Sequence, residues 1–144
     1  MNLFTIGYEG RTADELPRSV AASGITTVID VRDLPLSRKR GFSKTALALL
    51  LAGSGVGYMH ERRLGNPKQL RDHVKAGGDW GWFAQTFRER LAGTGDALDQ
   101  VLGIIQRGEV VCLLCYEADA SRCHRSLVAD ALAERADGLV VRHL

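Results

Sequence analysis

"LLCYEADASRCHRSLVADALAE" (residues 113–134) joins an apolar run to a helical pattern, and this junction decides the expected fold. The segment "EVVCLLCYE" (109–117) is the clearest strand in the sequence, because its apolar residues are continuous and partly β-branched. The helix that begins near Cys123 is expected to end at Gly138, since glycine commonly terminates helices. A buried strand followed by a short loop and a helix is the repeating unit of α/β proteins.

The same alternation of strands and helices runs through the rest of the sequence. We expect strands at residues 3–7, 26–32, 56–60, 109–117 and 139–144. We expect helices at residues 12–23, 44–54, 80–93, 96–108 and 123–138. Residues 61–78 are expected to be mostly a connection that holds a single helical turn. The pattern predicts one α/β domain over residues 1–144, with a mainly parallel sheet of about five strands and helices on both faces.

Composition is that of an ordinary globular protein, with 45% hydrophobic and 25% charged residues. No segment approaches the roughly 18 consecutive apolar residues of a membrane span. The N-terminal residues lack the basic and apolar regions of a signal peptide, so we expect a cytoplasmic protein that has no contact with membranes. The three cysteines are an odd number, which argues against a disulfide framework.

Charge is distributed unevenly along the chain. Residues 31–75 contain ten Lys or Arg and three Asp or Glu, a net charge of +7, whereas the remaining residues sum to −5. This segment is either a solvated face or a surface for an anionic partner, which can be a small molecule or a nucleic acid. The basic residues concerned are Arg32, Arg38, Lys39, Arg40, Arg62 and Arg63.

Parallel strands with right-handed crossovers place every strand-to-helix loop along one edge of the sheet, where α/β proteins bind ligands. Polar residues that follow the predicted strands are therefore expected to meet there. They are Tyr8, Glu9, Arg32, Asp33, His60, Glu61, Arg62, Arg63, Cys115, Tyr116 and Glu117.

The loop between Cys115 and the last helix combines a thiol with two arginines. A helix N-terminus attracts anions, and Arg122 and Arg125 add guanidinium donors that suit phosphate, sulfate or carboxylate. Such surroundings stabilise a thiolate. This layout is typical of cysteine-dependent phosphatases and sulfurtransferases. However, the spacing from Cys115 to Arg122 is one residue longer than in the phosphatase loop, and the loop has no glycine.

These patterns assign candidate roles to individual residues. The candidate catalytic residues are Cys115 as nucleophile, or else a small hydrophobic residue of the core, His124 as proton-transfer group, and Arg125 as a clamp on the anion. The anion-binding candidates are Arg32, Arg38, Arg62, Arg122 and Arg125, and the supporting residues are Asp30, Glu117 and Tyr8. Cys123 can act as the resolving partner of Cys115.

Metal binding is the alternative for the same cysteines. Cys115, Cys123 and His124 can form a zinc site together with His60. Cys112 does not join them, because strand residues three apart point to opposite faces, and we assign it to the core. Since a second C-x2-C pair is missing, we expect no metal and no other cofactor.

Four motifs together resemble a family of bacterial and archaeal proteins, domain of unknown function 488. They are "TIGYEG" (5–10), "VIDVRDLPLSR" (28–38), "GVGYMHERRLG" (55–65) and "LLCYEADASRCHR" (113–125). The resemblance covers nearly the whole chain. It implies an α/β domain with these motifs around a common site, and it implies no particular activity.

A weaker similarity links "VIDVRD" and the segment 113–134 to rhodanese-like domains. It implies that Cys115 carries sulfur and that Arg125 and Ser126 correspond to the Arg-Ser pair of that fold. The loop is longer here, and the usual Gly-His-Ile segment is missing.

Three functions therefore remain open at this point. The first is a cysteine-dependent transferase or hydrolase that acts on an anionic phosphoryl- or sulfuryl-type group. The second is a domain that binds or processes nucleic acid or nucleotides through the basic surface of residues 32–63. The third is a regulatory domain without catalysis. The sequence leaves the oligomeric state undetermined.

Overall fold

A computed structural model describes residues 1–144 and contains five strands and six α-helices. The strands are β1 (Asn2–Gly7), β2 (Thr27–Asp30), β3 (Gly57–His60), β4 (Val111–Cys115) and β5 (Val140–His143). The helices are α1 (Glu15–Ala22), α2 (Lys44–Ala52), α3 (Lys68–Lys75), α4 (Trp80–Ala92), α5 (Gly95–Gln106) and α6 (His124–Arg135). Two short 3-10 helices, η1 (Arg62–Leu64) and η2 (Ala120–Arg122), lie in loops.

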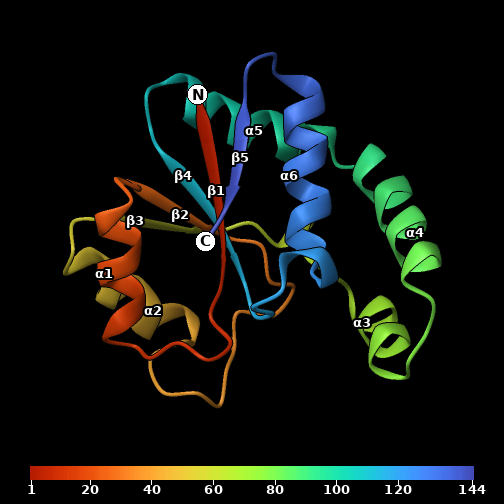
Figure 1. The fold of residues 1–144 in the computed structure, drawn as a ribbon, viewed down its shortest axis with the longest axis horizontal. Helices are drawn as coiled ribbons and strands as arrows, with labels where there is room; N and C mark the ends of the chain where they lie inside the picture. Colours follow the sequence, from red (N-terminus) through yellow and green to blue (C-terminus); the bar gives the residue numbers. More distant parts are fainter.

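The five strands form one parallel sheet in the order β3-β2-β4-β1-β5, which confirms the expected fold class (Figure 1). All five residues of the central strand β4 are buried, as its continuous apolar sequence predicts. The register pairs Gly7 with Cys115 and Asp30 with Leu114. The carboxyl ends of β1, β2 and β4 are therefore adjacent.

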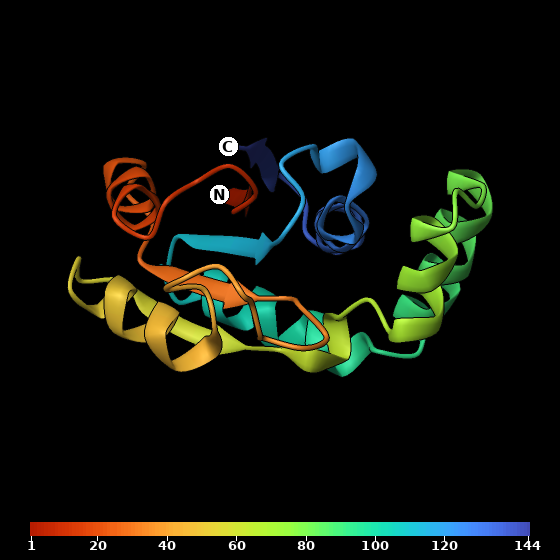
Figure 2. The ribbon, with the colours of Figure 1, turned by 90° about the horizontal axis from the view of Figure 1, so that it is seen from below.

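Helices cover both faces of the sheet, as Figure 2 shows. Helices α1 and α2 pack on one face, where Cys112 lies in a core cluster with Val28 and Leu114. Helices α5 and α6 pack on the other face, and the larger cluster there includes Cys115 and Cys123. Cys112 is fully buried and faces away from the other two cysteines, so its assignment to the core is confirmed.

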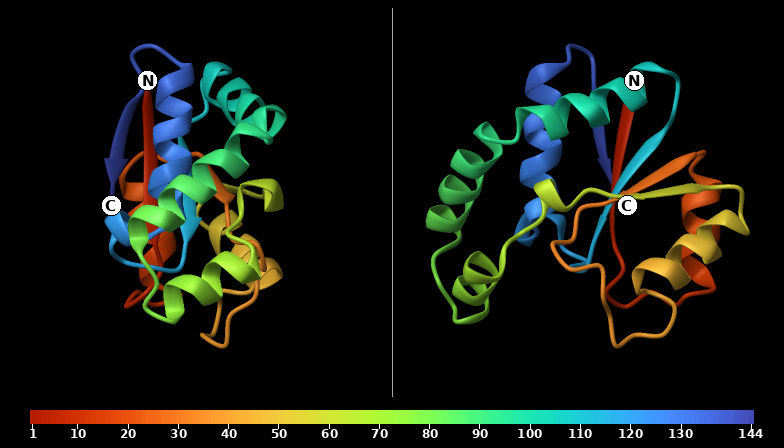
Figure 3. Two further views of the ribbon diagram at one scale, coloured as in Figure 1. Left: turned by 90° about the vertical axis from the view of Figure 1, so that its right-hand side faces the viewer. Right: turned by 180° about the vertical axis from the view of Figure 1, so that it is seen from behind.

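The segment 61–78 contains more helix than the sequence pattern predicts. It forms η1 and the two-turn helix α3, which packs against α4 and stands with it beyond α6 (Figure 3). The expectation of a single turn was wrong because α3 is almost entirely polar and buries only Leu70, so its apolar signal is weak. This helix brings two cations to the site described below.

The first helix also begins later than expected, at Glu15 rather than Thr12. The Thr12 hydroxyl accepts a hydrogen bond from the Glu15 backbone N–H (3.1 Å). Pro17 therefore falls in the first turn, where a missing N–H breaks no helical hydrogen bond. None of the helices is both long and apolar enough to span a lipid bilayer.

Candidate functional site

A cavity of about 330 Å³ lies at the carboxyl ends of β1, β2 and β4. One part of its lining carries reactive or titratable groups, namely Cys115, Glu117 and His124. A second part is cationic and consists of Arg32, Arg71 and Lys75. The third part is apolar or aromatic and consists of Tyr8, Leu34, Leu36 and Tyr116. A larger cavity of about 750 Å³ lies between α1 and α2, but it is lined by no cysteine or histidine.

Cys115 and Cys123 face each other at this cavity. Cys115 ends β4, Cys123 directly precedes α6, and their Sγ atoms form a disulfide, which the odd number of cysteines did not lead us to expect. The two Cα atoms are 7.6 Å apart, wider than the ~4.4–6.8 Å usual for a disulfide. Each residue is 1% exposed, and of the two only Cys115 lines the cavity. The loop of residues 116–122 thus brings two thiols together that lie eight residues apart in sequence.

Arg125 holds this loop in place from the inside. Its Nη1 donates to Cys115 Sγ (3.1 Å) and to the Glu117 carbonyl, and its Nη2 donates to the Ala118 carbonyl (3.3 Å). Its Nε donates to Thr5 Oγ1 (3.0 Å). Arg125 is fully buried, and every donor nitrogen already has an acceptor within the protein. Its geometry therefore fits a residue that orders the loop and stabilises a thiolate rather than one that grips an anion from solvent.

The loop approaches β1 so closely that only glycine fits at position 7. A Cβ at Gly7 would overlap the carbonyl of Glu117. The loop is also fastened by the Glu9 carboxylate, which accepts a hydrogen bond from the Ala118 N–H (3.0 Å). The glycine of the "TIGYEG" motif thus allows the Glu117 carbonyl to reach Arg125.

Glu117 places a carboxyl group beside the sulfur of Cys115. Its Oε2 lies 3.4 Å from Cys115 Sγ. Burial raises the pKa of Glu117, and the charge of Arg125 lowers it by less. A carboxyl group that keeps its proton closer to neutral pH can share or donate that proton at the sulfur.

His124 is buried between the sheet and α4. Its Nε2 lies 2.7 Å from the Val31 carbonyl, and its ring packs edge-on against Phe87. A carbonyl oxygen only accepts hydrogen bonds, so Nε2 carries the hydrogen and Nδ1 offers a lone pair to Cys123 Sγ at 3.8 Å. Burial lowers the pKa of His124 to about 4. The imidazole is therefore neutral at pH 7 and acts as an acceptor that orients Cys123.

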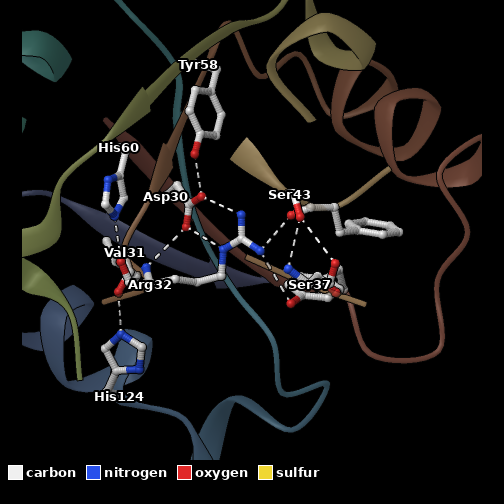
Figure 4. Close-up of polar contacts among 10 residues, drawn as sticks. Asp30, Val31, Arg32, Ser37, Ser43, Tyr58, His60 and His124 are labelled. Atoms are coloured by element: carbon white, nitrogen blue, oxygen red, sulfur yellow. Dashed lines mark hydrogen bonds and ion pairs between the residues drawn. The ribbon is translucent and has the colours of Figure 1, made fainter. Parts of the chain in front are cut away.

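Arg32 is held by its own network, drawn in Figure 4. Its Nε and Nη2 bind Asp30 Oδ1 and Oδ2 (2.9 and 2.7 Å), and its Nη1 donates to the Phe42 carbonyl (2.7 Å). Tyr58 donates to the same carboxylate (2.5 Å), and the Tyr8 hydroxyl accepts from Arg32 Nη1 (3.3 Å). Burial alone lowers the pKa of Arg32, but Asp30 and Tyr8 outweigh it and raise the pKa overall. Asp30 and Tyr8 therefore both contact the guanidinium of Arg32 directly.

The other predicted anion-binding residues are spread over the surface. Arg38 is exposed on the 33–43 loop and lines none of the cavities described. Arg62 is exposed, contacts Asp33 (3.4 Å) and lines a separate groove. Arg122 lines a small adjoining cavity of about 60 Å³ together with Glu117 and His124. Of these three residues, only Arg122 lies beside the cysteine pair.

Three polar residues of the cavity lining were missed by sequence reasoning, as were the two leucines, Leu34 and Leu36. Arg71 and Lys75 project from α3, and Asn66 precedes that helix. Arg71 Nη1 contacts Asp33 (3.2 Å), whereas Lys75 has no hydrogen-bond partner. The Oδ1 atom of Asn66 is buried and unpartnered. The signal that could have found the cations is their spacing of four residues, which puts both on one helical face.

Potential metal ligands also gather at the loop. Cys115, Glu117 and Cys123 each offer an atom within 4.8 Å of the others. His60 does not belong to this set, because its Nε2 bonds the Arg32 carbonyl (2.7 Å) from the side opposite His124 (Figure 4). The zinc set that includes His60 is thus not assembled.

The fold and the site together define the class of protein. It is an α/β protein with a parallel sheet and with two facing cysteines beside a pocket at the carboxyl ends of the strands. The family model described as "Domain of unknown function DUF488" matches residues 12–132, so the protein belongs to the DUF488 family. The resemblance carried by the four motifs is thereby confirmed. No curated protein and no solved structure is significantly similar to the chain.

Proposed function

We propose that the protein is a thiol-dependent enzyme that accepts sulfur from an anionic donor, with Cys115 as nucleophile and Cys123 as resolving thiol. The observation that carries this proposal is the contact between the sulfur of Cys123 and that of Cys115, a residue that lines a cationic cavity. A nucleophile next to a second thiol can pass its covalent intermediate on to that thiol.

Sulfur transfer fits this loop better than phosphoryl transfer. A phosphoryl group needs several N–H donors around its oxygens. The carbonyls of Glu117 and Ala118 point inward to Arg125, so the loop offers acceptors there. The pKa of the Glu117 carboxyl is raised by burial, so this group can supply a proton to a departing sulfur beside Cys115.

Arg125 and His124 prepare the two thiols for different roles. The guanidinium of Arg125 at 3.1 Å favours the thiolate of Cys115. In the reduced protein, His124 Nδ1, which lies 3.8 Å from Cys123 Sγ, can accept the hydrogen bond of that thiol and keep the sulfur oriented toward its partner. Arg71 and Lys75 attract the anionic donor to the opposite wall of the cavity.

The reaction with thiosulfate illustrates the balance of atoms and electrons. Cys115 thiolate attacks the outer sulfur, the sulfur–sulfur bond of thiosulfate breaks, and sulfite leaves with the bonding electron pair. Cys115 then carries a persulfide. Cys123 thiolate attacks the Cys115 sulfur, hydrosulfide leaves with a proton from Glu117, and the two cysteines form a disulfide. The cysteines are thereby oxidised, the transferred sulfur is reduced, and a dithiol reductant restores the enzyme.

A single-turnover experiment tests this proposal. Reduced protein is mixed with thiosulfate, and sulfite and hydrosulfide are measured. We expect both products from the wild type, and neither from Cys115→Ser. Cys123→Ser is expected to release sulfite and to keep one added sulfur on Cys115, seen by mass spectrometry. Sulfite release that survives in Cys115→Ser would contradict the assignment, and Cys112→Ser is the matched control.

Nucleic-acid binding is the second candidate, and one groove favours it. The groove has a volume of about 570 Å³, shares Asp33 with the thiol cavity, and is lined by Arg62, Arg63, Lys68 and Arg90. Three of these cations already pair with carboxylates, which weakens the attraction for a polyanion. Replacement of Arg38, Lys39 and Arg40 by Glu tests the basic 33–43 loop, and it should reduce the affinity for nucleic acid in a gel-shift assay. No affinity of the wild type for DNA or RNA in the same assay rejects this candidate.

A further inference from the structure

The thiol cavity has an apolar wall that an inorganic anion does not use. The ring of Tyr8 stacks on Phe42 with centroids 4.6 Å apart, and the ring of Tyr116 meets Tyr8 edge-on at 5.3 Å. These aromatic rings lie at the end of β1 and β4, beside Cys115. The wall therefore presents two aromatic rings at an angle to each other, and it borders the candidate nucleophile.

Two leucines on the 33–43 loop extend this apolar wall at the mouth of the cavity. Leu34 is 49% exposed and Leu36 is 70% exposed, although both line the cavity. The loop that carries them is closed by Ser37 and Ser43, which share two hydrogen bonds of 3.1 and 3.2 Å (Figure 4). Large apolar side chains held in solvent beside a pocket are typical of a surface that packs against a ligand.

The size and the polar groups of the cavity also fit an organic molecule. Its volume of about 330 Å³ falls at the lower end of the ~300–1,000 Å³ range of small-molecule sites. A bare inorganic anion would contact the cations and leave the remaining lining unused.

We propose that the substrate is an organic sulfur donor, in which an anionic thiosulfonate-type group carries the transferred sulfur and a flat apolar group packs on this wall. The inference rests on the proposed sulfur transfer. Cys115 thiolate attacks the terminal sulfur of the donor, the sulfur–sulfur bond breaks, and an organic sulfinate leaves with the electron pair. The persulfide is resolved by Cys123 as above, with a dithiol as the reductant.

Three donors that present similar reacting groups test this inference. They are benzenethiosulfonate, methanethiosulfonate and thiosulfate, each assayed with reduced protein and a dithiol by release of sulfinate or sulfite. Burial of the phenyl ring is expected to raise kcat/KM for benzenethiosulfonate about 10-fold or more above that for methanethiosulfonate. The measured quantity is the ratio of these two constants. It is divided by the ratio of the rates at which the two donors react with a free small-molecule thiol, which corrects for their intrinsic reactivity.

Substitutions on the loop locate the apolar contact. Leu34→Ser and Leu36→Ser should each reduce the ratio of the two constants severalfold. Leu49→Ser is the matched control, since Leu49 is also 70% exposed but lies on α2 outside the thiol cavity, and it should leave the ratio unchanged. Because these leucines are exposed, their replacement should not prevent folding, which circular dichroism verifies.

The outcomes separate the two proposals. A corrected ratio near one, or a high ratio that Leu34→Ser and Leu36→Ser leave intact, overturns the organic substrate while sulfur transfer stands. Failure of all three donors to release sulfinate or sulfite, in protein whose cysteines are reduced, overturns sulfur transfer itself.

Discussion

The Nη1 atom of Arg125 lies 3.1 Å from the sulfur of Cys115, although the two residues occupy opposite ends of the loop that joins β4 to α6. The same guanidinium binds the carbonyls of Glu117 and Ala118. One buried cation therefore determines both the path of the loop and the electrostatic environment of the candidate nucleophile.

Arg125→Lys should weaken both the packing of the loop and the stabilisation of the Cys115 thiolate. Lysine keeps the charge but cannot donate to Thr5, the sulfur and two carbonyls at once, so we expect a loss of about 3 kcal/mol in the free energy of unfolding. Denaturant unfolding measures this loss, and alkylation of Cys115 in the reduced variant should be slower at neutral pH. An unchanged alkylation rate in folded Arg125→Lys would show that the guanidinium does not activate the thiol.

Gly7→Ala should displace the same loop from the other side. The added methyl group meets the Glu117 carbonyl, which cannot move away without losing Arg125. We expect destabilisation by about 3 kcal/mol in denaturant unfolding. Gly93→Ala is the control, because its Cβ would meet its nearest neighbour at an ordinary 3.5 Å, and equal stability of the two variants would contradict the predicted clash.

His124 should make the protein less stable in mild acid. Burial lowers its pKa from 6.5 to about 4, so the unfolded chain binds the proton more tightly than the folded protein between these values. The associated stability is complete above pH 6.5 and is lost as the pH falls toward 4, by about 3 kcal/mol in total. Unfolding at pH 7 and pH 4.5 should show a smaller pH effect for His124→Gln than for the wild type. An equal loss of stability in the two proteins would mean that a group other than His124 causes the acid sensitivity.

Arg71→Gln and Lys75→Gln should each raise KM for an anionic donor by about 5- to 10-fold, because each removes a cation from the wall of the cavity. Added salt screens these charges, so it should raise the KM of the wild type and reduce the difference from the variants. Arg107→Gln, at the exposed end of α5, is the matched control. Unchanged KM values in both cavity variants would show that the anion binds away from Arg71 and Lys75.

The sequence was sufficient to predict that the strand ends lie along one edge of the sheet, but not the order of the strands. The observed order puts β1, β2 and β4 side by side, and this brings Tyr8, Arg32 and Cys115 to one cavity. The contact between Cys115 and Cys123 could not be predicted, because it depends on the path of the loop, and their separation of eight residues does not determine that path.

The directions of the arginine side chains could not be predicted. Arg32 and Arg125 both follow the pattern of anion-binding residues, yet burial turns them toward Asp30, Thr5 and backbone carbonyls. Those acceptors are supplied by distant parts of the chain. The solvent-facing cation Lys75 lies on a polar helix whose existence depends on packing against α4.

The tight closure of the loop by Arg125 and Gly7 has a consequence for the redox state of the cysteines. A disulfide stabilises a protein mainly by removing loop-closure entropy from the unfolded chain, and the effect is smallest for short loops. The segment between Cys115 and Cys123 is short, and its native ends already meet through other contacts. For a loop of this length the relation gives roughly 2–3 kcal/mol, so oxidation should raise the melting temperature by several degrees while the other contacts keep the loop in place in the reduced protein.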